Sequence, residues 1–238
     1  MNLIFLDTET TDLGENARLV QLAYKDSVTG EVVREYFKPP VPVAFGAMAV
    51  HHITEKMLVD KPLFVGSLSQ EKLMELAKDH ILVAHNAAFD LQVLKNEGVV
   101  FGQFVDTVRL ARHLVNSEEY KLQYLRYFLN LDAEGMPHDA LGDVMVLEAL
   151  FGHLFDLVQN KFQLANPAEV LAKILELNQT PVLLEKFWFG KYSGKMFSEV
   201  LVSDRGYMDW LLASESQKKE SERNQEMIYT LKYYLKVS

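Results

Sequence analysis

The sequence predicts an α/β protein with a mixed β-sheet, because short apolar runs of strand composition alternate with stretches of helical periodicity. The first apolar run covers residues 3–6, and two further strand-like runs follow at 19–24 and 31–37. A short apolar run at 81–84 then stands between stretches of helical spacing. Strands joined by short turns indicate antiparallel pairing, and strands that alternate with helices indicate parallel pairing. Both are therefore expected in one sheet flanked by helices.

The first three strand-like runs predict an antiparallel meander. Residues 27–30, Ser-Val-Thr-Gly, separate the second run from the third and have the composition of a turn. Pro39, Pro40 and Pro42 then interrupt the chain. Because proline breaks regular hydrogen bonding, the segment up to Pro62 is predicted to be loop with short helical pieces.

Helical periodicity prevails from residue 69 onward. Leu73, Leu76 and Ala77 repeat at helical spacing after Ser69, which predicts that Ser69 caps this helix. Further helices are predicted near 87–97, 107–115, 121–130 and 140–158, and another from Asn166-Pro167 to about Leu177.

The chain is predicted to divide into three parts. Residues 1–160 form the α/β domain, residues 161–180 a helix and linker, and residues 181–238 a small C-terminal module of α+β or helical type that ends in a tail helix. Both tryptophans, Trp188 and Trp210, lie in this module. We expect its interior to be built from its aromatic side chains.

The composition is that of a globular chain, with 49% hydrophobic and 24% charged residues among 238. No apolar stretch approaches the roughly 20 residues that span a bilayer, and the beginning of the sequence lacks a basic leader. We therefore expect no membrane partner and a cytoplasmic location. Because the chain has no cysteine, a metal must bind oxygen or imidazole ligands, which favours hard ions such as Mg²⁺ or Mn²⁺.

The formal net charge of -9 argues against tight non-specific binding of nucleic acid, because phosphate groups usually bind basic surfaces. It does not exclude catalysis on a phosphate. Acids that hold divalent ions bring positive charge to the place where the phosphate must dock.

Asp7 and Glu9 close the first apolar run. Alternate side chains of a strand point to the same face, so both carboxyl groups leave one face of the sheet. Acids at the end of a buried strand are costly unless a cation meets them. Strand-end acids with no functional role are the alternative interpretation of this pair alone.

A second acid, Asp90, follows the strand-like run 81–84. Asn86, just before it, is in position to cap a helix, and Asp90 is favoured in the first turn by the helix dipole. A purely structural role is therefore an alternative for both residues. We interpret His85 as a structural histidine and not as a ligand.

The third segment pairs His138 with Asp143, five positions apart. On one continuous helix their side chains would differ by roughly 140° in direction. They converge only if His138 lies before the helix, on a loop. Pro137 and a candidate cap at Asp139 support a helix that begins after His138.

Together these segments resemble the DnaQ-like DEDDh family of 3′-to-5′ exonucleases over about residues 2–155. The five residues of its three motifs occur in the same order, namely Asp7, Glu9, Asp90, His138 and Asp143. The resemblance implies a ribonuclease H-like fold, which agrees with the predicted mixed sheet. It also implies hydrolysis of phosphodiester bonds from a 3′ end with release of nucleoside 5′-monophosphates.

The resemblance further implies a role for each motif residue around two Mg²⁺ (or Mn²⁺) ions. Asp7 bridges both ions, Glu9 and Asp143 complete the inner shell of one, and Asp90 supports the site. Two hard ions require several shared carboxylates. His138 is the implied general base, since an imidazole titrates near the working pH.

Substrate contacts are implied for Thr8, Thr10, Leu13, His51 and Asn86. Two positions depart from the family pattern. His52 and Asp12 each stand where relatives often carry glycine, although Leu13 still fits a residue that packs against the terminal base. The departure at His52 leaves open the local backbone shape and whether His51 contacts a nucleotide or is a plain surface histidine.

Residues 187–195 contain two glycine-lysine pairs. A phosphate-binding loop is excluded, because the spacing is too short and Met196 replaces the required Ser or Thr. The segment is similar to the C-terminal module of exonuclease X-like proteins. Lys191, Tyr192 and Lys195 are candidate contacts for single-stranded nucleic acid through charge and stacking. A folding or protein-docking role is the alternative, since the module is not strongly basic.

The leading hypothesis is therefore a metal-dependent 3′-to-5′ exonuclease that acts on DNA, at single-stranded or frayed ends. An RNA-trimming exonuclease with the same five residues is the nearest alternative. A third is a proofreading subunit that acts mainly when docked, through the C-terminal module, on a DNA polymerase or repair complex.

Overall fold

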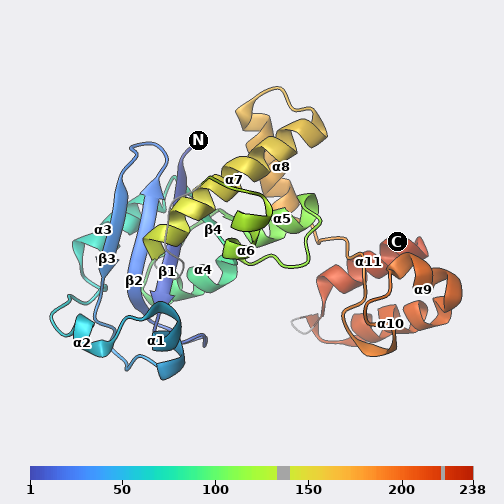
Figure 1. Cartoon of the computed structure of the whole chain (residues 1–238), viewed down its shortest axis with the longest axis horizontal. Helices are drawn as coiled ribbons and strands as arrows, with labels where there is room; N and C mark the ends of the chain where they lie inside the picture. The colour runs from blue at the N-terminus through green and yellow to red at the C-terminus, as the bar shows by residue number, and fades with distance from the viewer. Residues whose placement is uncertain (133–139, 221–222, 238) are drawn as a thin grey trace. The chain divides into compact units, whose positions relative to one another are not determined.

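A five-stranded sheet forms the centre of the N-terminal part of the chain (Figure 1). The computed structural model describes residues 1–132, 140–220 and 223–237. The chain divides into two compact units, Met1–Asn178 and Gln179–Ser238. No helix in the described part is long and apolar enough to cross a bilayer.

The sheet has the strand order β3-β2-β1-β4-β5. Its strands are β1 (Leu3–Thr10), β2 (Leu19–Asp26), β3 (Val32–Tyr36), β4 (Ile81–Ala84) and β5 (Phe104–Asp106). β1 pairs antiparallel with β2 and parallel with β4, and β4 pairs parallel with β5. The predicted mixed sheet and its antiparallel meander are confirmed, whereas the three-residue strand β5 was not predicted.

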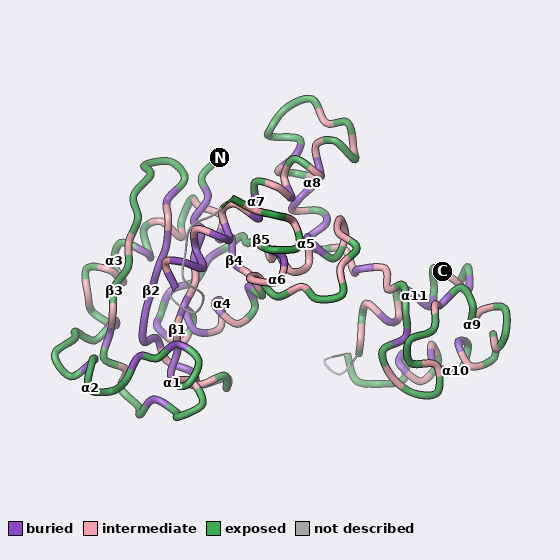
Figure 2. Tube along the Cα trace, in the orientation of Figure 1, coloured by how far each residue is buried: buried purple, intermediate pink, exposed green. Residues whose placement is uncertain are grey.

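The two faces of β1 pack against different helices. Leu3 and Phe5 belong to one apolar core with residues of α5, α7 and α8. Ile4 and Leu6 belong to a second core with residues of α3 and α4. Figure 2 shows β1 and β2 largely buried. Because alternate residues share a face, Asp7 and Glu9 project toward α7 and Thr8 projects toward α4.

Eight helices accompany the sheet within the described residues of this unit. They are α1 (Phe45–His51), α2 (Glu55–Leu58), α3 (Leu68–Leu76), α4 (Ala87–Asn96), α5 (Thr107–Leu114), α6 (Leu122–Phe128), α7 (Ala140–Phe162) and α8 (Pro167–Gln179). The five helices predicted from residue 87 onward are confirmed, and α7 continues four residues beyond its predicted end at 158.

The predicted cap at Ser69 is wrong, and the predicted cap at Asn86 is confirmed in position only. The side chain of Ser67 accepts a hydrogen bond from the N–H of Gln70, so Ser67 caps α3, and Ser69 lies inside the helix. Asn86 occupies the N-cap position of α4 with φ 68° and ψ 51°, but its side chain makes no capping hydrogen bond. The backbone of Asn86 is left-handed, whereas a residue whose side chain caps a helix is typically extended.

The C-terminal unit is helical. It contains a short 3₁₀ turn η1 (Gly190–Tyr192) and the helices α9 (Phe197–Ser203), α10 (Arg205–Gln217) and α11 (Gln225–Leu235). Its core is partly aromatic, with Phe187 stacked on Phe197 at 3.9 Å between ring centroids. Trp188 and Trp210 lie outside this core, 54% and 60% exposed, so the expectation that they build the interior is wrong for both.

Candidate metal centre

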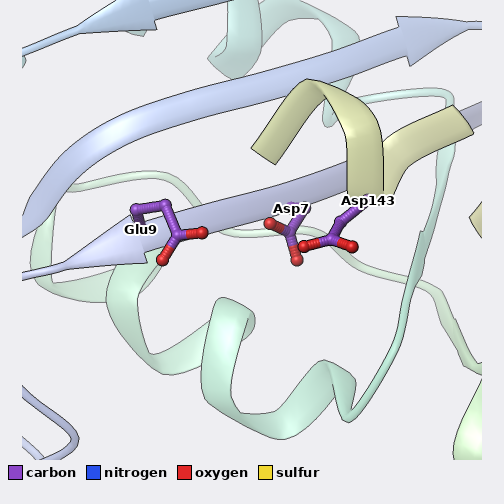
Figure 3. A group of neighbouring side chains, drawn as sticks. All are labelled: Asp7, Glu9 and Asp143. Carbon is purple, nitrogen blue, oxygen red and sulfur yellow. The ribbon is translucent and has the colours of Figure 1, made fainter. Parts of the chain in front are cut away.

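Three carboxylates from two distant segments meet at the end of β1. Asp7 and Glu9 come from β1, and Asp143 comes from the first turn of α7. One oxygen of each carboxylate lies within 4.8 Å of the corresponding oxygen of the other two. Figure 3 shows the carboxylates of Asp7 and Asp143 side by side, with Glu9 reaching toward them along the strand.

The three acids form a donor set suited to a hard divalent cation. At 4.8 Å, two carboxylates repel by about 3.5 kcal/mol at an effective dielectric constant of about 20. A divalent cation offsets this repulsion, and carboxylate oxygens are the ligands that Mg²⁺, Mn²⁺ and Ca²⁺ prefer. The residues present therefore fit a divalent metal.

Asp90 lies on the opposite face of β1 and is not a member of this group of three among the described residues. Its carboxylate is 4% exposed and accepts a 2.8 Å hydrogen bond from the hydroxyl of Thr8. Burial raises the pKa of Asp90 to about 7, although the Thr8 hydroxyl acts in the opposite direction. Thr8, predicted to contact substrate, is engaged here with Asp90.

The other predicted substrate-contact residues surround the end of β1 and the start of α4. The hydroxyl of Thr10 donates to the main-chain oxygen of Asp12 at 2.7 Å. Leu13 is 88% exposed. The Asn86 side chain is also exposed, and its main-chain N–H donates to the Asp106 carboxylate at 3.0 Å. Leu13 and Asn86 are thus accessible to a ligand.

His51 is 6% exposed and binds main-chain groups through both ring nitrogens. Its Nδ1 accepts from the N–H of Ile53 at 2.9 Å, and its Nε2 lies 3.2 Å from the main-chain oxygen of Thr10. Burial lowers the pKa of His51, which favours the neutral ring. In this structure His51 ties the end of β1 to α1, and its predicted nucleotide contact stays a prediction.

His52, which replaces a glycine of the family pattern, keeps a backbone conformation that suits glycine. Its φ is 59° and its ψ 15°, in the left-handed region. Glycine adopts this conformation without the cost of roughly 1–2 kcal/mol that a side chain brings. The turn after α1 is therefore compatible with glycine, and histidine adopts the same backbone conformation at a higher energy.

His85 has the structural role predicted for it. Its Nδ1 lies 2.9 Å from the hydroxyl of Thr107, and its Nε2 lies 2.7 Å from the main-chain oxygen of Tyr120. Burial lowers the pKa of His85. His138, together with Pro137 and the candidate cap Asp139, lies outside the described residues, so the structure leaves the predicted general base untested.

Two glutamines beside the acids were not singled out from the sequence. Gln123 on α6 donates from Nε2 to the Asp143 carboxylate at 2.5 Å. Gln21 on β2 pairs with Glu9 in the sheet and accepts through Oε1 from the N–H of Ala140 at 3.2 Å. The only sequence signal was Gln21 itself, a polar residue inside the strand-like run 19–24.

In the C-terminal unit, two of the three candidate nucleic-acid contacts bind a neighbouring acid. Lys191 Nζ and the Tyr192 hydroxyl lie 2.8 Å and 2.7 Å from the Asp204 carboxylate. These partners hold the pKa of Asp204 at about 2. Lys191 also lies over the Tyr207 ring, 5.0 Å from its centroid. Lys195 is exposed.

Family models match both units of the chain. The model described as exonuclease matches residues 4–151. A second model, described as exodeoxyribonuclease X-like C-terminal, matches residues 187–216.

Curated relatives include proteins matched over nearly the full length and over part of the chain. The chain is 31% identical over 240 residues to exodeoxyribonuclease 10 of Escherichia coli (strain K12), with 98% of each chain covered. It is 30% identical over 169 residues to DNA polymerase III subunit epsilon of Buchnera aphidicola subsp. Acyrthosiphon pisum, covering 62% of this chain and 70% of the relative.

Two solved structures share the fold. Exonuclease X in complex with 5′ overhanging duplex DNA superposes with a TM-score of 0.55 at 30% identity, covering 73% of this chain and 99% of that one. A 3′-exonuclease solved in recognition of a histone mRNA stem-loop superposes with a TM-score of 0.51, covering 65% of this chain and 81% of that one. Its identity is 13%, so this second likeness concerns the fold alone.

Proposed function

Because the chain belongs to the exonuclease family, we propose that it is a metal-dependent 3′-to-5′ exodeoxyribonuclease that releases nucleoside 5′-monophosphates. The observation that carries this proposal is the convergence of Asp7, Glu9 and Asp143, which come from β1 and α7. Hydrolysis of a phosphodiester develops negative charge on phosphate oxygens, and a cation held by three acids offsets that charge.

The DNA substrate follows from the extent of the likeness. Exodeoxyribonuclease 10 matches 98% of this chain, and the match includes the C-terminal unit. RNA is the alternative substrate, since an RNA-trimming exonuclease would use the same five motif residues. We propose that the substrate is a single-stranded or frayed 3′ end.

The metal is proposed to bind as two Mg²⁺ or Mn²⁺ ions. Asp7, Glu9 and Asp143 would hold them, with Asp90 supporting the site from the other face of β1. Bound there, the cations would make water a stronger nucleophile and would stabilise the leaving oxygen.

The chain's own residues then have separate tasks. Asp7 and Glu9 would hold the cations to which the reacting phosphate binds. Thr8 holds the Asp90 carboxylate through its 2.8 Å hydrogen bond, which keeps that buried acid oriented. His138 takes the proton of the attacking water, because an imidazole accepts a proton at neutral pH.

The C-terminal unit is proposed to hold nucleic acid. It carries nine Lys and Arg against eight Asp and Glu, whereas the first unit carries 15 against 25. Lys195 contributes a positive charge for phosphate groups. The ammonium of Lys191 lies over the ring of Tyr192, and both are candidate contacts through charge and stacking. Docking on a DNA polymerase or repair complex is the alternative role, favoured by the likeness to polymerase III epsilon subunits. The cytoplasmic location stays a prediction.

The test uses matched end-labelled DNA and RNA strands with Mg²⁺ or Mn²⁺. We expect shortening from the 3′ end of DNA, little on RNA, and none with EDTA. Asp7→Asn is expected to lower the rate by more than about 100-fold, since it removes a direct metal ligand. Asp156→Asn, an exposed acid on α7, is the matched control with an unchanged rate. Absence of 3′ shortening on both nucleic acids contradicts the proposal.

A further inference from the structure

The first turn of α7 is held by two amide side chains that come from other elements. Gln123 on α6 binds the Asp143 carboxylate, and Gln21 on β2 binds the N–H of Ala140 at the first residue of the helix. Ala140 is fully buried and Asp143 is 9% exposed. Both contacts therefore act on the one turn that brings Asp143 to Asp7.

The Gln123 contact is well placed to orient the Asp143 carboxylate. Its Nε2 lies 2.5 Å from Oδ1. Leu125 on α6 packs in one core cluster with Ala140 and Val144, which fixes α6 against the start of α7. A carboxylate accepts several hydrogen bonds, so this bond still leaves it able to bind a cation.

The chemistry of an amide matters at this position. A lysine or arginine beside Asp143 would neutralise the carboxylate and repel a divalent cation. Glutamine is a neutral donor, so it fixes the direction of the carboxylate and leaves its negative charge available to the metal.

Gln21 ties the start of α7 to the strand beside Glu9. It is 1% exposed and stands opposite Glu9 in the β1–β2 ladder, so both side chains leave the same face of the sheet. The first four N–H groups of a helix lack partners within the helix. Gln21 Oε1 supplies one for Ala140, while its Nε2 has no hydrogen-bond partner among the described residues. The hydrogen bond to Ala140 therefore holds the Gln21 side chain in the core.

We propose that Gln123 and Gln21 are positioning residues that hold the Asp143 carboxylate in the geometry required to bind a divalent cation with Asp7 and Glu9. The inference rests on the proposed function, because it presumes the metal site. Gln123 sets the direction of the carboxylate, and Gln21 sets the position of the helix turn. Partners of this kind change metal affinity by roughly 10- to 100-fold when they are removed.

The experiment measures Mn²⁺ binding to the purified full chain by calorimetry, without nucleic acid. Gln123→Met and Gln21→Met keep the unbranched shape of the side chain but lose the amide, and each is expected to raise the Mn²⁺ dissociation constant roughly 10- to 100-fold. Gln159→Met is the matched control, a partly exposed glutamine on α7 away from the acids, with an unchanged constant.

Melting temperatures separate positioning from a purely structural role. If the glutamines only stabilise the fold, both methionine variants melt earlier but bind Mn²⁺ as the wild type does, and that result overturns the proposal. Should Gln21→Met fail to fold, Gln123→Met still decides, because its side chain is only partly buried. If the wild type itself neither binds Mn²⁺ nor shortens DNA, the proposed function fails. If the wild type binds Mn²⁺ and Asp143→Asn does not, the metal site is supported, and the methionine variants then test the glutamine inference alone.

Discussion

Asp143→Asn is expected to change thermal stability in opposite directions with and without a divalent cation. The ligand oxygens of Asp7, Glu9 and Asp143 lie within 4.8 Å of one another. Two unit charges at that distance repel by about 3.5 kcal/mol at an effective dielectric constant of about 20 and by about 1 kcal/mol in bulk water. Because Asp7 and Glu9 are partly exposed, we take about 1.5 kcal/mol for each of the two pairs that Asp143 forms.

The substitution also removes a favourable charge from the first turn of α7, which costs about 0.5–1 kcal/mol. The free energy of unfolding without metal is therefore expected to rise by about 2 kcal/mol. For a unit of this size, about 2 kcal/mol corresponds to a melting temperature roughly 4–8 °C higher. In EDTA the variant should therefore melt later than the wild type.

Addition of a divalent cation reverses the order. A cation at 100 times its dissociation constant stabilises the wild type by about 2.7 kcal/mol, or roughly 5–11 °C. Asp143→Asn loses a charged ligand, so its melting temperature is expected to remain nearly constant when Mn²⁺ is added.

The assay is thermal denaturation followed by far-ultraviolet circular dichroism, in EDTA and in Mn²⁺. Tryptophan fluorescence does not serve, because Trp188 and Trp210 both lie in the C-terminal unit. Asp156→Asn, which removes an exposed charge from the same helix, should follow the wild type in both conditions. A variant that melts earlier than the wild type in EDTA, or gains as much from Mn²⁺, refutes the repulsion argument.

Three further predictions concern single contacts. Thr8→Val removes the hydrogen bond to the buried Asp90. In urea denaturation it is expected to lower the free energy of unfolding by about 1–3 kcal/mol. In rate measurements it is expected to lower the DNA cleavage rate roughly 10-fold or more. Ser67→Ala should cost about 1 kcal/mol in urea denaturation because it removes the α3 cap, whereas Ser69→Ala should cost less than about 0.5 kcal/mol. The pKa of Asp204 is lowered to about 2 in the folded chain. The contribution of Asp204 to stability is therefore present above the ordinary pKa of an aspartate, near 4, and is lost as the pH falls from about 4 to 2. Acid titration of the wild type and of Asp204→Asn tests this, because the variant should lack this contribution.

The sheet and its main helices were predictable because each depends on residues close together in the sequence. The run Leu3–Thr10 is apolar and then acidic, and the stripe along Ala140–Phe162 repeats at helical spacing. Period two along β1 also placed Asp7 and Glu9 on one face. By contrast, β5 has only three residues, Phe104–Asp106, which is too short a run for an alternation pattern to be visible.

The partners of the acids were not predictable, since they depend on tertiary packing. Gln21 and Ala140 are 119 positions apart, and Thr8 and Asp90 are 82 positions apart. Each of these bonds depends on which face of β1 or β2 a helix covers. The cap of α3 was wrongly predicted at Ser69 for a similar reason: Ser67 and Ser69 both precede the apolar repeat, and only the backbone conformation decides which one has the extended geometry of a cap.

The position of β1 between two helical layers explains why the candidate site can depend on residues so far apart. The odd-numbered residues of β1 face α7, so Asp7 meets Asp143 on that side, while Thr8 points to the α4 face and holds Asp90. One strand therefore aligns an acid from each layer. Since both layers pack against the same buried strand, a displacement of either helix layer relative to β1 would separate the acids. Rigid packing of apolar residues on the two faces is thus a physical requirement for the metal site that the acids at the end of the strand are proposed to form.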